Sequence, residues 1–317
     1  MRAIVYTAPL TLEHRAEQPE PVAGPGEVVV EVRAVGICGS ELEGFRSQSP
    51  FRVPPLVMGH ELAGVRLDTG ERVTVNPLIA CGRCDRCLRG LRNVCRTRAL
   101  VGIQRDGGFA ERVALPEACC VPLPDGLSFA DGALVEPVAN AVHALALAQA
   151  HDPQPARVGV IGAGMLGLAT ALVAQRLGVE QVVITDLSAE RLESARAAGV
   201  RHTAERLSGE FDVIVDAVGS AQTRATSAEL LVPGGSAVWI GLHGADAGFD
   251  GLALIRGERR VLGTFAYLER DFARALEIVA QLDTSAWVAS APLDDGVEVF
   301  LDLLERPPAH AKTLLVP

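Results

Sequence analysis

Residues 158–167 read VGVIGAGMLG, and this stretch decides the fold of the chain. The apolar run at 158–161 predicts a strand, and residues 165–177 predict a helix directly after it. The turn between them carries the pattern G-x-G-x-x-G, formed by Gly162, Gly164 and Gly167. In this context the pattern is typical of a dinucleotide site, because the glycines allow a tight turn and a close backbone approach to a pyrophosphate. The helix N-terminus at Met165 then presents free N–H groups to the phosphates.

An acidic residue follows where the ribose of such a nucleotide is bound. Asp186 ends the next predicted strand, 19 residues after Gly167. A carboxylate at this place binds a ribose 2′-OH and repels a 2′-phosphate, so NAD is favoured over NADP. Two alternatives stay open: Arg191 is close enough in sequence to bind a 2′-phosphate, and Asp186 could simply cap the helix that follows.

Strand and helix patterns alternate downstream of this turn. The predicted strands are 181–185, 211–216 and 236–241, and the predicted helices are 189–198 and 222–231. Such alternation implies a parallel sheet covered by helices, and therefore an α/β fold. The first third of the chain instead favours short strands between turns, at 28–35, 70–75 and 109–115. A helix is predicted at 130–150, with a break or kink at Pro137, then a helix at 271–282 and a last strand at 313–316.

Length and charge limit the classes of protein to which the chain can belong. The chain has 317 residues, enough for roughly two domains, and a formal net charge of −10. Nonspecific binding to nucleic acid or to an anionic membrane is therefore not expected. The N-terminal residues lack the apolar core of a signal peptide. The longest apolar run, 158–174, contains four glycines and is not a membrane span. We expect a cytoplasmic protein.

Four of the seven cysteines lie within 15 residues, in the segment CGRCDRCLRGLRNVC at 81–95. They are Cys81, Cys84, Cys87 and Cys95. Thiolates at this spacing can surround one tetrahedral zinc ion, and a four-thiolate site leaves no position open for chemistry. An iron–sulfur cluster uses other spacings, and disulfides are not expected in a reducing compartment. The segment therefore predicts a structural zinc site.

Two shorter segments contain candidate ligands of a second metal. One holds Cys38 and Ser40, and the other holds His60 and Glu61. A thiolate and an imidazole are common ligands of a catalytic zinc, which keeps one position for water or substrate. Taken singly, a cysteine such as Cys38 is more often a buried core residue than a metal ligand. A single histidine such as His60 is equally weak evidence for a metal site.

The combination resembles a known family. The segments GICGSE (36–41), GHE (59–61), the cysteine loop, DGGFAE (106–111) and LVEP (134–137) are similar, in order and spacing, to the zinc-dependent medium-chain dehydrogenases. The similarity extends over nearly the whole chain and is greatest to the polyol (sorbitol-type) branch. In that branch a Glu-Pro pair, here Glu136-Pro137, occurs where ordinary alcohol dehydrogenases have a third cysteine ligand.

The resemblance implies an architecture. A GroES-like β-barrel catalytic domain comprises residues 1–139 and 266–317 and carries the zinc loop 81–95. A Rossmann NAD-binding domain, residues 140–265, is inserted into it, with the active site in the cleft between the two. A homodimer or homotetramer is expected, with no nucleic-acid or membrane partner.

The resemblance also assigns roles to residues. Cys38 and His60 bind a catalytic zinc, Glu136 ligates it directly or through water, and Glu61 exchanges with substrate or water as a ligand. Ser40 supplies the hydroxyl that accepts the substrate proton. Positions that line NAD are Leu166, Asp186, Arg191, Ile240, Gly241, Leu242 and Phe265. The expected cofactors are two zinc ions per chain, one catalytic and one structural, and NAD.

Two departures from the family pattern concern proton movement and metal affinity. The usual aspartate that orients the zinc-binding histidine is Glu41 here, one methylene longer. Where many relatives have a histidine that exports the proton, this chain has Glu43, so the proton leaves through Glu43 or directly to solvent. His143, on the helix after Glu136, is expected to be a packing or cofactor-adjacent residue.

The expected reaction is hydride transfer between a secondary alcohol (a polyol, sugar alcohol or related substrate) and NAD, with the ketone as product. A simple alcohol or L-threonine-type dehydrogenase is the alternative, and a non-catalytic nucleotide-binding protein is a remote one. The substrate stays open. Residues 43–55 are expected to line the pocket entrance, where Arg46, Ser47, Gln48 and Arg52 suit a hydroxylated or anionic substrate, although loop arginines are usually solvated.

Overall fold

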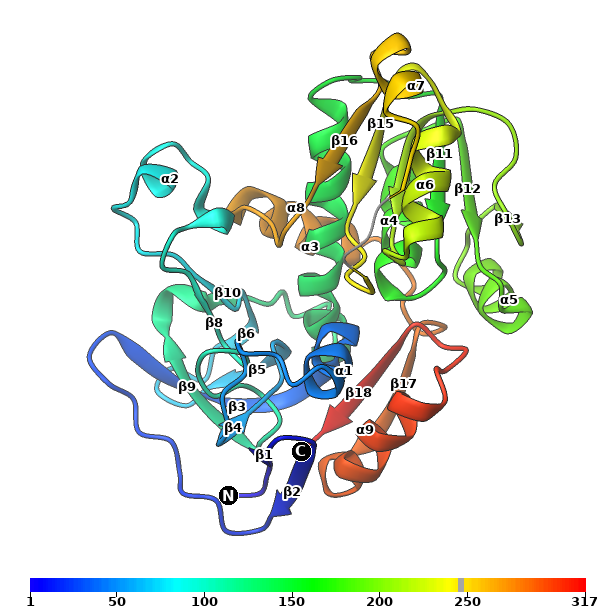
Figure 1. Ribbon diagram of the computed structural model, residues 1–317. Coiled ribbons are helices and arrows are strands. Elements are labelled where there is room, and N and C mark those ends of the chain that lie inside the picture. Colours follow the sequence, from blue (N-terminus) through cyan, green and yellow to red (C-terminus); the bar gives the residue numbers. More distant parts are fainter. Residues whose placement is uncertain (245–247) are drawn as a thin grey trace. The chain divides into compact units, whose positions relative to one another are not determined.

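The computed structural model describes residues 1–244 and 248–317, and the chain divides into two compact units (Figure 1). The first unit comprises Met1–Glu136, Val288–Pro308 and Lys312–Pro317, and the second comprises Pro137–Trp287 and Ala309–Ala311. The predicted boundaries lie after residues 139 and 265. The second boundary observed is 22 residues further on, after Trp287, so helix α8 (Glu269–Val279) belongs to the second unit.

The first unit is built on a mostly antiparallel sheet around the long strand β3 (Glu27–Ile37), in which only the edge pair β17–β18 is parallel among the pairings of the described residues. Val28, Val30 and Val32 alternate inward along β3, which is the period of a half-buried strand. β3 pairs with β5 (Glu61–Arg66), β9 (Arg112–Pro116) and β18 (Lys312–Val316). The strand order is β10-β6-β5-β3-β18-β17.

The sheet register brings three distant segments to one place. Gly36 near the end of β3 is opposite Glu61, the first residue of β5. Ile37 is opposite Thr313, the second residue of β18. The residues that follow β3 therefore lie beside the beginnings of β5 and β18.

The other elements of this unit are β1 (Ala3–Ala8), β2 (Thr11–Arg15), β4 (Leu56–Val57), β6 (Arg72–Val75), β7 (Leu78–Ile79), β8 (Ala99–Leu100), β10 (Cys120–Pro122), β17 (Val288–Pro292), α1 (Gly39–Arg46), α2 (Asp85–Leu88) and α9 (Gly296–Glu305).

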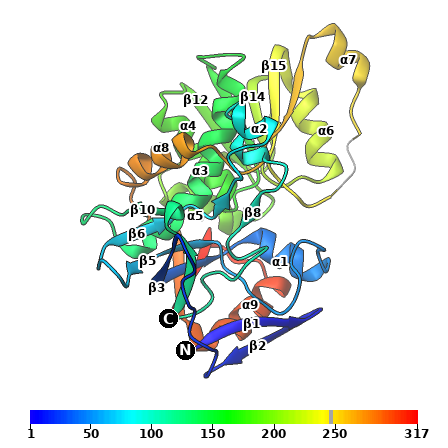
Figure 2. The ribbon, with the colours of Figure 1, turned by 90° about the vertical axis from the view of Figure 1, so that its left-hand side faces the viewer.

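The second unit contains the predicted parallel sheet, of which strands β12, β14 and β15 are labelled in Figure 2. The strand order is β13-β12-β11-β14-β15-β16. The strands are β11 (Arg157–Ile161), β12 (Gln181–Thr185), β13 (His202–Ala204), β14 (Phe211–Asp216), β15 (Leu231–Trp239) and β16 (Arg260–Gly263). All five pairings within this sheet are parallel. The helices are α4 (Met165–Arg176), α5 (Ala189–Ala197), α6 (Ala221–Glu229), α7 (Gly251–Arg256) and α8. The α/β fold class predicted from the glycine-rich stretch is confirmed.

Helix α3 (Phe129–Gln149) crosses the division between the units at Pro137. The sequence predicted a break or kink there, but the helix continues through the proline as one element. Ser128 caps the start of the helix, because its Oγ accepts the Asp131 N–H at 3.1 Å. Within residues 1–244 and 248–317, the structure contains no helix that is both long enough and apolar enough to cross a membrane.

Candidate active site and metal centres

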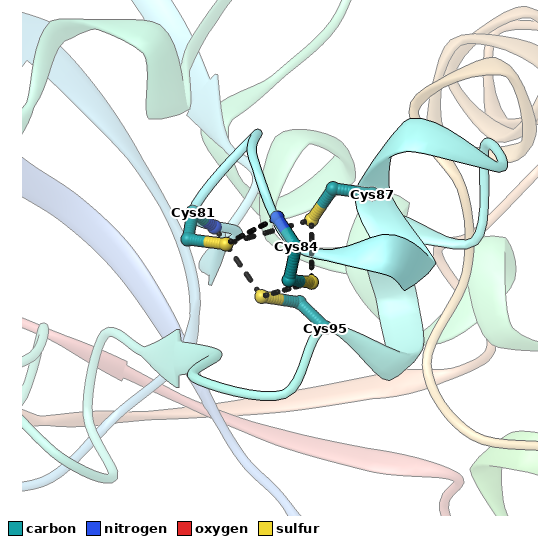
Figure 3. Close-up of side chains that lie close together, drawn as sticks. All are labelled: Cys81, Cys84, Cys87 and Cys95. Atoms are coloured by element: carbon teal, nitrogen blue, oxygen red, sulfur yellow. Dashed lines mark hydrogen bonds between the residues drawn. The ribbon is translucent and has the colours of Figure 1, made fainter.

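The four cysteines of the loop converge on one point (Figure 3). Cys84 Sγ lies 3.6 Å from Cys87 Sγ and 3.9 Å from Cys95 Sγ, and Cys81 Sγ lies 3.9 Å from Cys87 Sγ. Four ligands about 2.3 Å from a tetrahedral zinc ion stand about 3.8 Å from one another. The sulfur positions therefore fit the predicted structural zinc.

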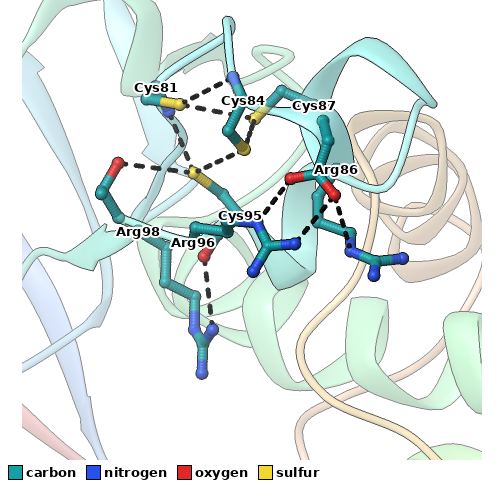
Figure 4. A network of polar contacts seen from close by, with 9 residues as sticks. Cys81, Cys84, Arg86, Cys87, Cys95, Arg96 and Arg98 are labelled. Carbon is teal, nitrogen blue, oxygen red and sulfur yellow. Dashed lines mark hydrogen bonds and ion pairs between the residues drawn. The ribbon is translucent and has the colours of Figure 1, made fainter.

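The charges in the loop also fit a bound cation. Backbone N–H groups of Arg83 and Cys84 lower the pKa of Cys81 to about 6. Burial and the neighbouring sulfurs raise the pKa of Cys87 to about 12. Four crowded thiols cannot all ionise unless a positive charge lies among them. Arg86, Arg96 and Arg98 surround the cluster (Figure 4), and Arg96 forms an ion pair with Asp85 at 2.5 Å.

The second cluster lies at the end of the sheet where β3, β5 and β18 meet. Ligand atoms of Cys38, His60 and Glu61 all lie within 4.8 Å of one another. Cys38 directly follows β3 and caps α1, and Glu61 begins β5. A sulfur, an imidazole nitrogen and a carboxylate oxygen are the donor types of a catalytic zinc. Both carboxylate oxygens of Glu61 lie within 2.7 Å of the Lys312 ammonium, and each oxygen keeps a further lone pair that can bind a metal. The residues fit the metal that the sequence predicted.

Glu41 holds the histidine of this cluster. Its Oε1 accepts the Gly59 N–H at 2.8 Å and lies 2.9 Å from His60 Nδ1, and its Oε2 accepts the Cys38 N–H at 3.0 Å. The longer side chain thus makes the contact that an aspartate makes in the family. Nδ1 is engaged, which leaves Nε2 as the ring nitrogen for a metal.

Glu41 and His60 shift each other's pKa. Burial alone would raise the pKa of Glu41, but the His60 ring, the Arg52 charge and the Cys38 N–H outweigh it and hold the pKa below its ordinary value. Burial alone would lower the pKa of His60, but the Glu41 carboxylate and the Cys38 sulfur raise it well above its ordinary value. The surroundings therefore favour positive charge at this ring, which is what a bound cation supplies.

A lysine that the sequence prediction did not assign completes the cluster. Lys312 Nζ lies 2.7 Å from Glu61 Oε1 and 2.6 Å from Oε2, and it donates to Ile37 O at 3.1 Å. Both side chains of the pair are buried. Lys312 is the only lysine in the chain, and this was the one feature of the sequence that could have drawn attention to it. Its partner is 251 residues away, so local patterns could not find the pair.

Ser40 lies beside this cluster, in the first turn of α1. Its hydroxyl donates to Cys38 Sγ at 3.3 Å and accepts from Arg52 Nη2 at 3.3 Å. Glu43 lies on the same helix and is half-buried. Glu136 is buried on α3 and is not a member of the 4.8 Å group. The roles predicted for Glu43 and Glu136 stay predictions.

The glycine-rich turn has the geometry that its pattern predicts. Gly162 has a φ of +98°, which favours glycine. A Cβ on Gly167 would lie 1.7 Å from Gly162 O, so only glycine allows α4 to approach β11 this closely. Asp186 follows β12, and its Oδ2 accepts the Ala163 N–H of the turn at 2.8 Å. Arg191 Nη1 lies 3.8 Å from the same oxygen. Asp186 therefore fixes the turn in addition to any contact with a ribose.

The other predicted nucleotide positions lie at or after the ends of strands in the second unit. Ile240 is buried, and its N–H and that of Gly241 donate to Asp216 O, at the end of β14. Leu242 and Phe265 are exposed. Ligands of an open parallel sheet bind at the carboxyl ends of its strands, which is where these residues lie. His143 is buried, and its Nδ1 lies 2.7 Å from Asp271 Oδ2; its role as a packing or cofactor-adjacent residue stays a prediction.

Comparison with known proteins gives consistent matches. The family model of the alcohol dehydrogenase GroES-like domain matches residues 24–125, and that of the zinc-binding dehydrogenases matches residues 166–281. A D-xylulose reductase A from Aspergillus fumigatus is 33% identical over 308 residues, which cover 88% of this chain and 84% of that protein. An L-threonine 3-dehydrogenase from Rhizobium johnstonii is 35% identical over 231 residues, which cover 69% of this chain and 66% of that protein's length.

A solved structure agrees over the full length. A zinc-binding dehydrogenase from Sinorhizobium meliloti bound to NADP is 28% identical and superposes with a TM-score of 0.89. The match covers 100% of this chain and 99% of that chain. The GroES-like and Rossmann folds expected from the sequence are thereby confirmed.

Proposed function

The chain belongs to the zinc-dependent medium-chain dehydrogenase family, and we propose that it reversibly oxidises a secondary alcohol to a ketone with NAD as hydride acceptor. Enzymes of this family act on small-molecule alcohols. The observation that carries the proposal is the convergence of Cys38, His60 and Glu61 within 4.8 Å. The names of two relatives point to the same kind of reaction. One oxidises L-threonine at carbon 3, and the other reduces D-xylulose, a ketose; both reactions interconvert a secondary alcohol and a ketone.

The side chains have separate tasks. When bound, zinc polarises the alcohol oxygen and NAD accepts the hydride. Cys38, His60 and Glu61 hold the metal, and Glu41 fixes the His60 ring through Nδ1. Ser40 Oγ, which lies 3.3 Å from Cys38 Sγ, would accept the proton of the alcohol while it releases its own hydroxyl proton toward Glu43 or solvent. Proton exit through Glu43 and ligation by Glu136 are part of this proposal.

A matched set of variants tests the assignment. Cys38→Ser and His60→Ala are expected to abolish NADH formation with a panel of secondary alcohols while leaving NADH binding, measured by fluorescence, intact. Metal analysis should find two zinc ions in the wild type and one in either variant. Unchanged turnover in a variant that has lost one zinc ion would contradict the proposed site.

For the cofactor, we propose a preference for NAD over NADP, although the solved relative holds NADP. Asp186 places a carboxylate at the end of β12, where it repels a 2′-phosphate. Arg191 lies 3.8 Å from this carboxylate and is partly neutralised by it. Asp186→Ala should therefore raise kcat/KM for NADP relative to NAD. An unchanged ratio would contradict this role of Asp186.

We further propose a cytoplasmic homodimer or homotetramer. The oligomer is expected from the family resemblance, and light scattering after gel filtration tests it. The location is supported by the use of cysteine in the sequence: four of the seven cysteines are clustered within 15 residues at metal-ligand spacing, which fits a reducing compartment. Isolation of the protein with oxidised Cys81–Cys95 thiols from fresh cells would contradict the location.

A further inference from the structure

Arg52 is a buried cation that the proposed mechanism does not use. It is 7% exposed, whereas its neighbours Phe51 and Val53 are 68% and 69% exposed. The chain thus turns an arginine inward and two large apolar side chains outward, which reverses the usual preference. Because this arrangement works against stability, it indicates a function for the buried guanidinium.

The backbone before Arg52 sets this direction. After α1, the Ser49 N–H donates to Gly44 O at 2.9 Å and returns the chain toward the helix. The Arg52 N–H then donates to Ser49 O at 3.1 Å, which closes a β-turn with Pro50 at its second position. Gly44 leaves room for the side chain, since a Cβ at this residue would lie 2.5 Å from Arg52 Nη1.

The guanidinium has few partners for a buried charge. Among residues 1–244 and 248–317, Ser40 is the one side chain that accepts a hydrogen bond from it, at 3.3 Å. Its Nε atom is buried without a partner, and no carboxylate in the described part of the chain lies within 4.0 Å of it. Glu41 attracts Arg52 electrostatically, but both Glu41 oxygens accept hydrogen bonds from other groups. A buried charge with no bound counter-ion is costly.

We propose that Arg52 binds an acidic group of the substrate, so that the substrate is an anionic secondary alcohol carrying a carboxylate or a phosphate. The planar fork of a guanidinium matches both of these groups. This inference deepens the proposed function and rests on it, because Arg52 contacts Ser40, the hydroxyl assigned to the alcohol proton. Ser40 in turn contacts Cys38, so the anion is bound beside the reacting carbon.

The first experiment measures binding without turnover. Malonate and inorganic phosphate are titrated calorimetrically into the zinc-loaded enzyme with NAD, one arm for each kind of acidic group. The anion that binds the wild type should bind Arg52→Gln roughly 10- to 100-fold more weakly, since hydrogen bonds to a charged group are lost. Arg33→Gln is the matched control, because Arg33 is exposed and paired with Glu31 in the same unit; its affinity should equal that of the wild type.

Gly44→Ala provides a second variant that keeps the charge. The new Cβ displaces the end of the Arg52 side chain, which is flexible, while alanine favours helix α1 more than glycine does. This variant should fold, but its affinity for the anion should be at least tenfold lower than that of the wild type. Arg52→Lys should recover only part of the affinity, because an ammonium lacks the planar fork.

The second experiment compares alcohols that differ in one terminal group. Sorbitol is compared with gluconate and with sorbitol 6-phosphate, and xylitol with xylonate. In Arg52→Gln, kcat/KM for the preferred anionic member should fall roughly 10- to 100-fold more than kcat/KM for the neutral member does.

Three results would overturn the inference: retention of anion affinity in Arg52→Gln, equal losses for neutral and anionic alcohols, or turnover of neutral alcohols alone. A failure of the proposed function is distinguishable from these. It would appear as an absence of NADH formation with every alcohol, whatever the anion titrations show.

Discussion

Lys312→Met is expected to weaken the end of the sheet that carries the catalytic cluster. The substitution removes the ammonium that lies 2.6 Å from Glu61 Oε2 and leaves the carboxylate behind. The two side chains are 3% and 1% exposed, so water cannot replace the lost partner. Methionine keeps an unbranched apolar stem, so the main change is in charge rather than packing.

The magnitude follows from the burial of the pair. Removing one partner of a buried ion pair costs about 3–5 kcal/mol, because the remaining charge is uncompensated. The ammonium also donates to Ile37 O, which adds about 1 kcal/mol for a buried acceptor left without a donor. A loss of this size, about 4–6 kcal/mol, increases the equilibrium constant for local opening by a factor of about 1,000 or more.

Hydrogen–deuterium exchange of the metal-free protein measures this opening locally, since a bound zinc ion would itself compensate the Glu61 charge. Peptides from β3, β5 and β18 should exchange faster in Lys312→Met, whereas peptides from β11, β12 and β14 in the second unit should be unchanged. The double variant Lys312→Met/Glu61→Gln removes both charges and should recover most of the protection, with metal analysis confirming that zinc is absent from each sample. Equal exchange in the wild type and Lys312→Met, or no recovery in the double variant, would refute the reasoning.

Three further predictions concern other parts of the chain. Cys95→Ser should lower the zinc content from two ions to one and lower the melting temperature, and metal analysis with calorimetry checks both; a retained second zinc would contradict the four-thiolate site. Gly167→Ala should abolish NADH binding, measured by fluorescence, because the new Cβ would lie 1.7 Å from Gly162 O, a backbone atom that cannot turn aside. Asp271→Asn should cost about 1–3 kcal/mol at pH 7: burial raises the pKa of Asp271, but the His143 contact outweighs it and holds the pKa below 3.8. This stability is present above pH 3.8 and is lost as the pH falls through the lower folded-state pKa, so urea titrations of wild type and variant should converge in acid and would contradict the pairing if they did not.

Local sequence patterns predicted the second unit best. The bounds of β12 and β14 agree with the predicted ranges 181–185 and 211–216, because a strand buried on both faces is a short apolar run between turn residues. The glycine spacing predicted the turn after β11 because each glycine is required by backbone geometry, independently of distant residues. The metal ligands were predicted through their spacing within the family pattern.

Local sequence patterns did not predict the features that depend on tertiary contacts. Helix α1 was not predicted, because it is eight residues long and contains glycines and a serine. For Arg52 the sequence left two alternatives open, a substrate-binding residue or a solvated loop arginine, and only the turn anchored on Gly44 shows that the side chain is directed inward. Lys312 was not assigned from the sequence, because its role depends on the pairing of β18 with β3. Propensity and periodicity carry no information about such pairings.

The replacement of the family aspartate by Glu41 shows why these contacts matter for the chemistry. An added methylene would ordinarily move a carboxylate away from the His60 ring. Here the Cys38 and Gly59 N–H groups hold the two carboxylate oxygens, so the 2.9 Å contact to Nδ1 is kept. The same carboxylate caps α1, the helix that carries Ser40 and packs over Arg52. A change at residue 41 therefore alters the metal ligand, the proton acceptor and the proposed anion site together, and the three must be tested as one unit.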